Sequence, residues 1–76
     1  MRQKSIMIHL SDFHIKIKER RTLLGITQQD LADISGVGLR TIKGIETNRG
    51  NPSISTLSKI LDVLGMEIEL KIKSLN

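Results

Sequence analysis

The segment from Ser35 to Gly50 (SGVGLRTIKGIETNRG) predicts a helix with one basic face that carries no acidic residue. Val37, Ile42 and Ile45 have the spacing of the buried side of such a helix. The opposite side is left to Leu39, Arg40, Lys43, Gly44 and Thr47. A basic face of this kind suits a polyanionic partner, although an ordinary solvated helix face has a similar composition.

Side chains that could support catalysis or bind a metal are sparse. His9, Asp12 and His14 form the only cluster that resembles metal ligands, but their spacing crosses a strand-to-helix junction with no third imidazole or cysteine nearby. We interpret both histidines as surface residues. No serine has a base and an orienting acid in its sequence context, and no glycine-rich phosphate loop is present. The sequence therefore predicts no enzyme, no metal site and no cofactor.

Composition favours one small domain with an aliphatic core. The chain has 76 residues, no cysteine and a single aromatic residue, Phe13. Its net charge of +4 lies in residues 1–25, because acids and bases balance in residues 26–76. Clustered bases suit nucleic acid. The N-terminus lacks a long apolar region and a cleavage site, and no apolar run is long enough to span a membrane, so we expect a cytoplasmic protein.

Helical periodicity and capping signals position the basic segment after two earlier helices. The first is expected to begin at Phe13, with Ser11 or Asp12 as its cap, and to end at Gly25; its apolar positions are Phe13, Ile17, Leu23 and Leu24. Thr27 and Asp30 form a near relative of the capping box at the start of the second helix. Leu31, Ala32 and Ile34 are expected to face inward there. Gly36 ends this helix, so a very short turn precedes the third helix, from about Leu39 to Thr47.

Turn-forming residues separate the third helix from a fourth, and the period changes after that. Ser53 or Ser55 is expected to cap a helix whose inner residues are Leu57, Ile60, Leu61 and Leu64 and which stops at Gly65. From Met66 to Lys73 apolar and charged residues alternate, which predicts a half-buried strand. A weaker alternation at Ile6, Ile8 and Leu10 is a second candidate strand.

Several of these residues occur together in a known pattern. Arg21 and Gly25 precede a series made of Thr27-Gln28, Leu31-Ala32, Gly36-Val37, Thr41-Ile42, Ile45-Glu46, Pro52-Ser53 and Leu57. In this combination, residues 17–65 resemble the helix-turn-helix of the phage repressor, Cro and XRE family. The resemblance implies a mainly α, four-helix lambda-repressor-like domain. It also implies a transcriptional regulator, a repressor, that binds double-stranded operator DNA, commonly as a dimer.

The resemblance assigns roles to the basic face. The second helix of the pair lies in the major groove in such proteins, so Leu39, Arg40, Lys43, Gly44 and Thr47 would meet base edges. Arg40 can donate two hydrogen bonds to a guanine, Leu39 can pack on a thymine methyl, and Lys43 can read a base or a phosphate. Gly44 would let the backbone approach DNA closely.

Further residues would hold the DNA backbone. Gln28 opens the second helix, where free amides can meet a phosphate, and Asn48 and Arg49 lie just past the third helix. Gly38 is included in this set. The family more often has a serine or threonine at that cap, so the glycine weakens the cap of the third helix and removes the side chain that could contact a phosphate there. Arg21 is expected to be a structural partner of Glu46 rather than a phosphate ligand.

The C-terminal strand distinguishes relatives within the family. It resembles that of HipB-type antitoxins, in which this strand pairs with its copy in the dimer, and such antitoxins also contact a HipA-like kinase toxin. We therefore divide the chain into an arm or short strand (1–10), a DNA-binding domain (11–65) and a dimerisation strand (66–74) with Met66, Ile68, Leu70 and Ile72 on its apolar face. The alternatives are a stand-alone phage or mobile-element repressor, a protein interaction module without DNA binding, and a monomer whose strand pairs with residues 6–10.

Overall fold

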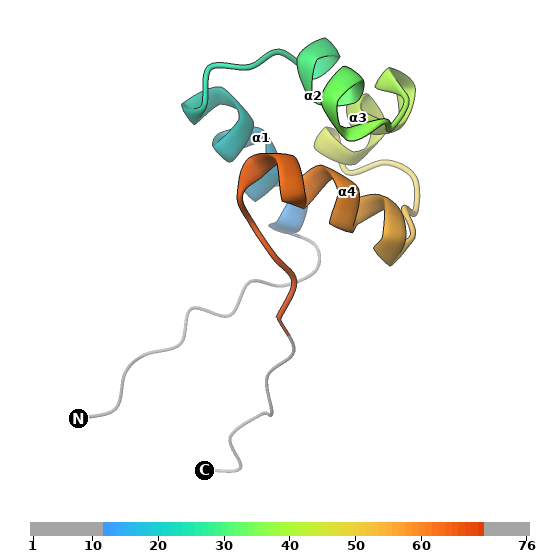
Figure 1. Ribbon diagram of the computed structural model, residues 1–76. Helices are drawn as coiled ribbons and strands as arrows, with labels where there is room; N and C mark the ends of the chain where they lie inside the picture. The colour runs from blue at the N-terminus through green and yellow to red at the C-terminus, as the bar shows by residue number, and fades with distance from the viewer. Residues whose placement is uncertain (1–11, 70–76) are drawn as a thin grey trace, which may run out of the picture.

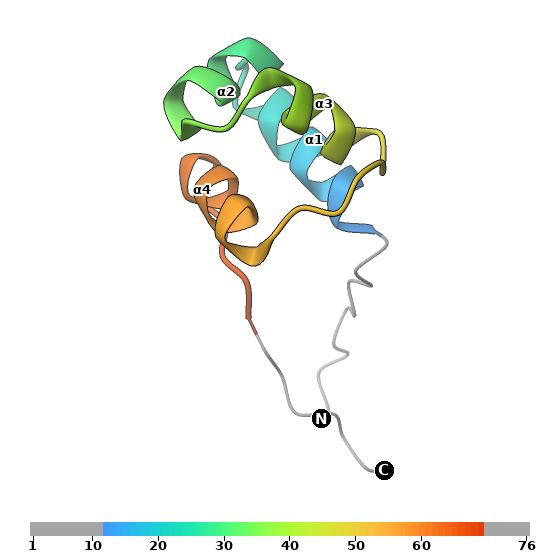
Figure 2. The same ribbon diagram turned by 90° about the vertical axis from the view of Figure 1, so that its right-hand side faces the viewer.

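The computed structural model describes residues 12–69 and contains four helices there: α1 (Phe13–Leu23), α2 (Gln28–Ser35), α3 (Leu39–Glu46) and α4 (Ile54–Leu64). Each of α1 and α2 packs against both α3 and α4 (Figures 1 and 2). This arrangement confirms the four-helix, lambda-repressor-like fold. None of the helices in residues 12–69 is long and apolar enough to cross a membrane.

The structure confirms the start of α2 and the ends of α2 and α4 that the capping residues predict. The Thr27 hydroxyl accepts a hydrogen bond from the Asp30 N–H at 2.9 Å, and the Asp30 carboxylate accepts one from the Thr27 N–H at 2.9 Å. Gly36 and Gly65 both adopt the left-handed conformation, with φ of 76° and 70°, that lets a helix end without a steric penalty on a Cβ. These local bonds position α2 and the short turn that follows it.

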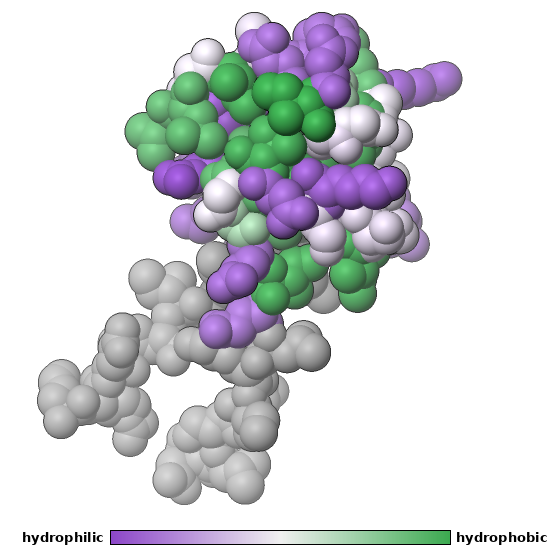
Figure 3. Space-filling view, in the orientation of Figure 1, coloured by the Kyte–Doolittle hydropathy of each residue, from purple (hydrophilic) through white to green (hydrophobic). Residues whose placement is uncertain are grey.

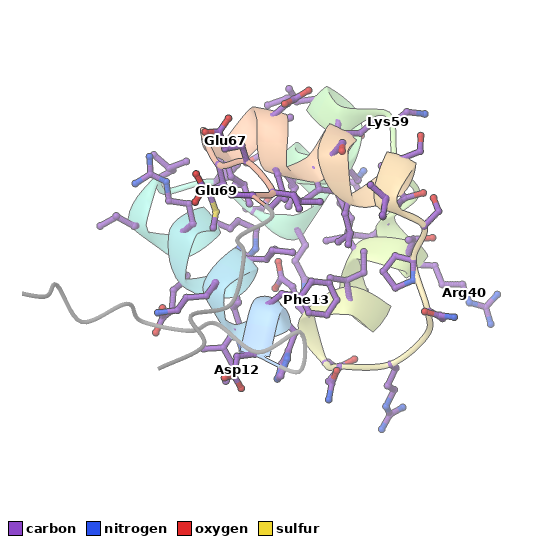
Figure 4. The ribbon with its side chains drawn as sticks, turned by 90° about the horizontal axis from the view of Figure 1, so that it is seen from below. Asp12, Phe13, Arg40, Lys59, Glu67 and Glu69 are labelled. Carbon is purple, nitrogen blue, oxygen red and sulfur yellow. The ribbon has the colours of Figure 1, made fainter. Side chains whose placement is uncertain are left out.

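The N-caps of α4 and α1 were each predicted as one of two residues, and the structure shows which residue occupies the cap position. Ser53, rather than Ser55, caps α4 through a bond from the Thr56 N–H at 3.1 Å. Asp12 occupies the N-cap of α1 but makes no side-chain cap bond. The beginning of α1 therefore depends on packing, with the ring of Phe13 turned toward the other helices (Figure 4).

The core is aliphatic, as the composition predicts. Its buried residues come from all four helices and the α2–α3 turn, and they are Ile17, Leu31, Ala32, Val37, Ile42, Ile45, Ile60, Leu61 and Leu64. Leu57, expected among them, is only partly buried. Since α3 contributes both Ile42 and Ile45, its basic side is turned outward.

Three leucine and isoleucine positions were assigned to the core wrongly. Leu23 is 75% exposed, Ile34 is 65% exposed and Leu24 is 44% exposed. At about 100° per residue, Leu23 is turned about 120° from the buried Ile17, and Ile34 about 200° from the buried Ala32. Leu24 has the right phase but lies beyond the last helical residue, at the C-cap of α1, and is still exposed. Leu23 and Leu24 thus lie at the C-terminal end of α1 and Ile34 near that of α2, and the face drawn in Figure 3 shows a large apolar area.

The segment after α4 is held at its first residues. The N–H groups of Gly65 and Met66 bond to the carbonyls of Asp62 and Leu61 at 3.3 and 2.9 Å, and the Arg20 guanidinium donates to the Leu64 carbonyl at 2.8 Å. Residues 66–69 then leave the bundle without regular secondary structure (Figure 1). The second half of the strand expected from Met66 to Lys73, and the arm 1–10, lie outside the described residues.

Removing the capping hydroxyl in a Thr27→Ala variant should lower the free energy of unfolding by about 1 kcal/mol, because the Asp30 N–H loses its acceptor in the first turn of α2. Urea unfolding followed by circular dichroism at pH 7 measures this change. A Ser58→Ala variant changes an exposed residue within α4 and serves as the control, with an expected effect within about 0.5 kcal/mol.

The same cap should show a defined pH dependence. The bonds from the Thr27 backbone and hydroxyl lower the pKa of Asp30. The ionised carboxylate therefore stabilises the fold above the unfolded pKa of about 3.9, and this contribution is lost as the pH falls through the lower pKa of the folded state. Wild type and Asp30→Asn should thus differ in stability at pH 6 and converge in acid. Equal differences at every pH would contradict the capping role of the charge.

Candidate nucleic-acid interface

The charged side chains on the exposed side of α3 are all basic. Arg40, Lys43 and Thr47 are exposed on it, while Glu46, the only acid of the helix, is 6% exposed. Arg40 extends away from the fold (Figure 4). A helix with its single carboxylate buried and its cations in solvent presents a positive surface to any partner.

Leu39 and Gly38 begin this helix in ways that limit their own contacts. Leu39 is only partly exposed because it also packs against the core. Gly38 is the N-cap of α3, and no side chain accepts from the first turn there. The sequence interpretation of a weakened cap is therefore confirmed, and backbone groups are all that Gly38 can offer a ligand.

The turn after α3 brings Arg49 back beside the helix. Its N–H donates to the Gly44 carbonyl at 2.7 Å, and Asn48 makes this reversal in the left-handed conformation with φ of 60°. A Cβ on Gly44 would lie 3.4 Å from the Arg49 carbonyl oxygen. This separation is ordinary van der Waals contact, so the turn does not require glycine at position 44, and the close approach of DNA expected there stays a prediction.

A cleft of about 320 Å³ lies between α3 and the turn, with Arg40 and Arg49 among its lining residues. Both arginines and Gly44 were predicted site residues, whereas the other lining residues were not: Thr41, Ile45, Gly50, Asn51 and Pro52. The turn signal of Asn51 and Pro52 was visible in the sequence, but its position beside Arg40 was not. The Thr47 hydroxyl, by contrast, is used internally, since it donates to the Lys43 carbonyl at 2.8 Å.

A buried ion pair joins α1 to α3, as expected. The Arg21 Nε and Nη2 atoms donate to the two oxygens of Glu46 at 2.7 and 2.9 Å, and Nη1 donates to the Ile26 carbonyl at 2.9 Å. The bond to Glu46 raises the pKa of Arg21, against the opposing effect of burial. Because both partners are largely buried, this pair sets how α1 and α3 meet.

Gln28 belongs to the same network, which the sequence analysis did not anticipate. Its side-chain amide donates to Oε1 of Glu46 at 3.1 Å, from the first residue of α2. No local signal links two residues 18 positions apart, so only the packing of α2 on α3 reveals this contact. Gln28 still stands at the helix terminus where a phosphate contact was expected.

The remaining candidate residues are placed only in part. Residues 12–69 contain no group of three potential metal ligands. His14 is not a plain surface residue, since it is half-buried and its Nδ1 has no hydrogen-bond partner among the described residues. Met66 packs against the core and Ile68 is 47% exposed. His9, Leu70 and Ile72 lie outside the described residues.

The tight turn between α2 and α3, the outward basic face of α3 and the buried Arg21–Glu46 pair define a helix-turn-helix DNA-binding domain. A helix-turn-helix family model matches residues 17–71. The chain therefore belongs to the XRE-type helix-turn-helix family of transcriptional regulators, which bind DNA and are not enzymes.

Individual relatives agree with this membership. An uncharacterized HTH-type transcriptional regulator of Methanocaldococcus jannaschii is 41% identical over 54 residues, which cover 71% of this chain and 82% of that protein. The restriction-modification controller protein C.AhdI from Aeromonas hydrophila is 31% identical with a TM-score of 0.71, covering 76% and 88% of the two chains. A chain of the HipA-HipB-O2-O3 complex is 27% identical with a TM-score of 0.78, covering 93% of this chain and 100% of that one.

Proposed function

We propose that this protein is a sequence-specific repressor that inserts α3 into the major groove of an operator. The observation that carries the proposal is the burial of Glu46, which leaves Arg40 and Lys43 as the charged groups on the exposed side of α3. Arg40, in the first turn of the helix, can donate two hydrogen bonds to a guanine, and Lys43 can reach a base or a phosphate.

We propose that the residues around α3 make two kinds of contact, one with base edges and one with the sugar-phosphate backbone. Leu39 keeps enough exposed surface to touch a thymine methyl, and Gly44 presents no side chain. Gln28, Gly38, Thr47, Asn48 and Arg49 are proposed to hold the sugar-phosphate backbone, which fixes the register without reading sequence. The cleft between Arg40 and Arg49 gives the backbone a concave and basic place to lie.

Titration of the full chain against its own promoter fragment tests this function. Fluorescence anisotropy should show tighter binding to that duplex than to a shuffled duplex of equal length, and the affinity should fall as salt rises because counterions are released. Binding that is absent, or that ignores salt, would favour the alternative of an interaction module without DNA binding.

We further propose that the protein acts as a homodimer through its C-terminal segment. Met66 already packs on the core, Ile68 is exposed beside it, and the alternation continues in sequence to Leu70 and Ile72. Pairing this segment with its copy would satisfy strand edges that a lone strand leaves open, and would add burial that a small domain lacks. Two copies of α3 would then face an inverted repeat with half-sites about 10 bp apart, or a multiple of that.

Ending the chain at Gly65 should abolish the dimer, because the proposed strand is removed while the four helices remain. Sedimentation equilibrium should give a dimer for the full chain at tens of micromolar and a monomer for the shortened chain. The shortened chain should keep the circular dichroism of the helices, which controls for unfolding. A full-length monomer would contradict the strand-mediated dimer and favour the intramolecular pairing with residues 6–10. A shortened chain that dimerises equally well would also contradict it, because another surface would then form the dimer.

The finer biological role that we propose is antitoxin of a HipBA-like operon, with a HipA-like kinase toxin as partner. The similarity to a chain of the HipA-HipB-O2-O3 complex supports this role, because it extends over 93% of this chain. Control of a restriction-modification operon is the second candidate, favoured by the 31% identity to C.AhdI. Co-expression with the product of the adjacent gene separates them: a kinase that co-purifies supports the first, and an adjacent restriction or methylation enzyme supports the second.

A further inference from the structure

The carboxylate of Glu46 is shared by three helices of the DNA-binding unit. Its Oε2 accepts from Arg21 on α1 at 2.7 Å, and its Oε1 accepts both from Arg21 at 2.9 Å and from the Gln28 amide on α2 at 3.1 Å. The side chain of Glu46 is 1% exposed, whereas Gln28 is only half-buried. Gln28 therefore lies between a buried charge and the surface.

The chemistry of this contact fixes which way the Gln28 amide points. An ionised carboxylate can only accept hydrogen bonds, so the NH₂ group of Gln28, and not its carbonyl oxygen, must face Glu46. One amide proton is used there, and the second remains available. The backbone N–H groups of Gln28 and Gln29 have no intrahelical acceptor because they lie in the first turn of α2, and the capping box satisfies only those of Thr27 and Asp30.

The charge of Glu46 would oppose an anion at this place if it stood alone. A phosphate bonded to Gln28 would be separated from the carboxylate by a single amide group, at a distance where like charges repel. Arg21 cancels this charge with two hydrogen bonds and is itself anchored to the Ile26 carbonyl. The other nearby acid, Asp30, is turned toward the Thr27 N–H by the capping box.

We propose that Glu46 and Arg21 are positioning residues for the DNA-backbone contact of α2: Glu46 holds the Gln28 amide so that its second proton meets a phosphate, and Arg21 neutralises Glu46 so that the phosphate is not repelled. This inference depends on the proposed DNA-binding function. The buried Arg21–Glu46 pair would then contribute to the affinity for DNA through the phosphate that Gln28 contacts, in addition to holding the helices together.

The experiment uses the full chain and operator duplexes in which one phosphate at a time is replaced by a neutral methylphosphonate. For wild type, replacing the phosphate that lies beside the start of α2 in each half-site should lower the affinity of the duplex about three- to tenfold, which is the size of one hydrogen bond. Gln28→Ala should remove this loss at that phosphate and leave the losses at other phosphates unchanged. That comparison identifies the phosphate that Gln28 contacts.

The positioning role is then tested in Arg21→Met/Glu46→Leu, which replaces the ion pair with apolar groups and avoids a lone buried charge. We expect the loss at the Gln28 phosphate to shrink to less than about twofold, with the losses at phosphates beside α3 and Arg49 retained. A loss of full size at the Gln28 phosphate in this variant would overturn the proposal, as would a wild type in which no phosphate depends on Gln28. Failure of the unmodified duplex to bind wild type would instead overturn the proposed function.

Discussion

An Arg21→Met variant should lose about 3 to 5 kcal/mol of unfolding free energy, because the Glu46 carboxylate would remain buried without its partner. Domains of this size are stable by roughly 5 to 15 kcal/mol, so much of the protein's stability would be lost. Urea unfolding at pH 7, followed by circular dichroism, measures the difference. The effect should be the largest of any exchange that leaves the aliphatic core intact.

Two controls separate the buried charge from charge removal in general. Lys16 and Glu19 form an exposed pair at 3.9 Å, and Lys16→Ala should cost at most about 1 kcal/mol. Arg21→Met/Glu46→Leu removes both buried charges and should recover most of the stability lost in Arg21→Met. If Arg21→Met were as stable as wild type, or the double variant less stable than Arg21→Met, the pair would not hold α1 and α3 as the structure indicates.

Arg40→Ala should weaken binding to the preferred operator by about 1 to 3 kcal/mol and remove the preference at one base pair per half-site. The reason is that the guanidinium of Arg40 extends into solvent from the first turn of α3, where base contacts concentrate (Figure 4). Selection from a random duplex library, performed on wild type and variant, measures both the affinity and the preference.

Arg49→Ala is the matched variant on the other side of the cleft. It removes the same charge from the turn after α3, so it should weaken all sequences to a similar degree and flatten the salt dependence. Lys59→Ala, on the exposed side of α4, should change neither quantity and controls for net charge. An Arg40→Ala variant that selects the wild-type sequence with unchanged preference would show that α3 does not read bases through this residue.

Local chemistry determined where α2 begins and where α2 and α4 end. The capping box of Thr27 and Asp30, and the left-handed positions Gly36 and Gly65, act within a few residues of chain, so their consequences were predictable from the sequence. The basic face of α3 was predictable for the same reason, because helical periodicity places Arg40 and Lys43 opposite Ile42 and Ile45. The family resemblance added the pairing of Arg21 with Glu46.

Only the tertiary structure decided which of these groups meet and which apolar residues are covered. Leu24 has the phase of a core residue but is 44% exposed at the C-cap of α1, and whether an apolar residue is covered depends on the elements packed around it. Gln28 contacts Glu46, and Arg40 shares a cleft with Pro52, because the packing of α2 on α3 and the turn after α3 bring them together. Such contacts depend on the relative placement of whole elements, which local spacing along the chain does not encode.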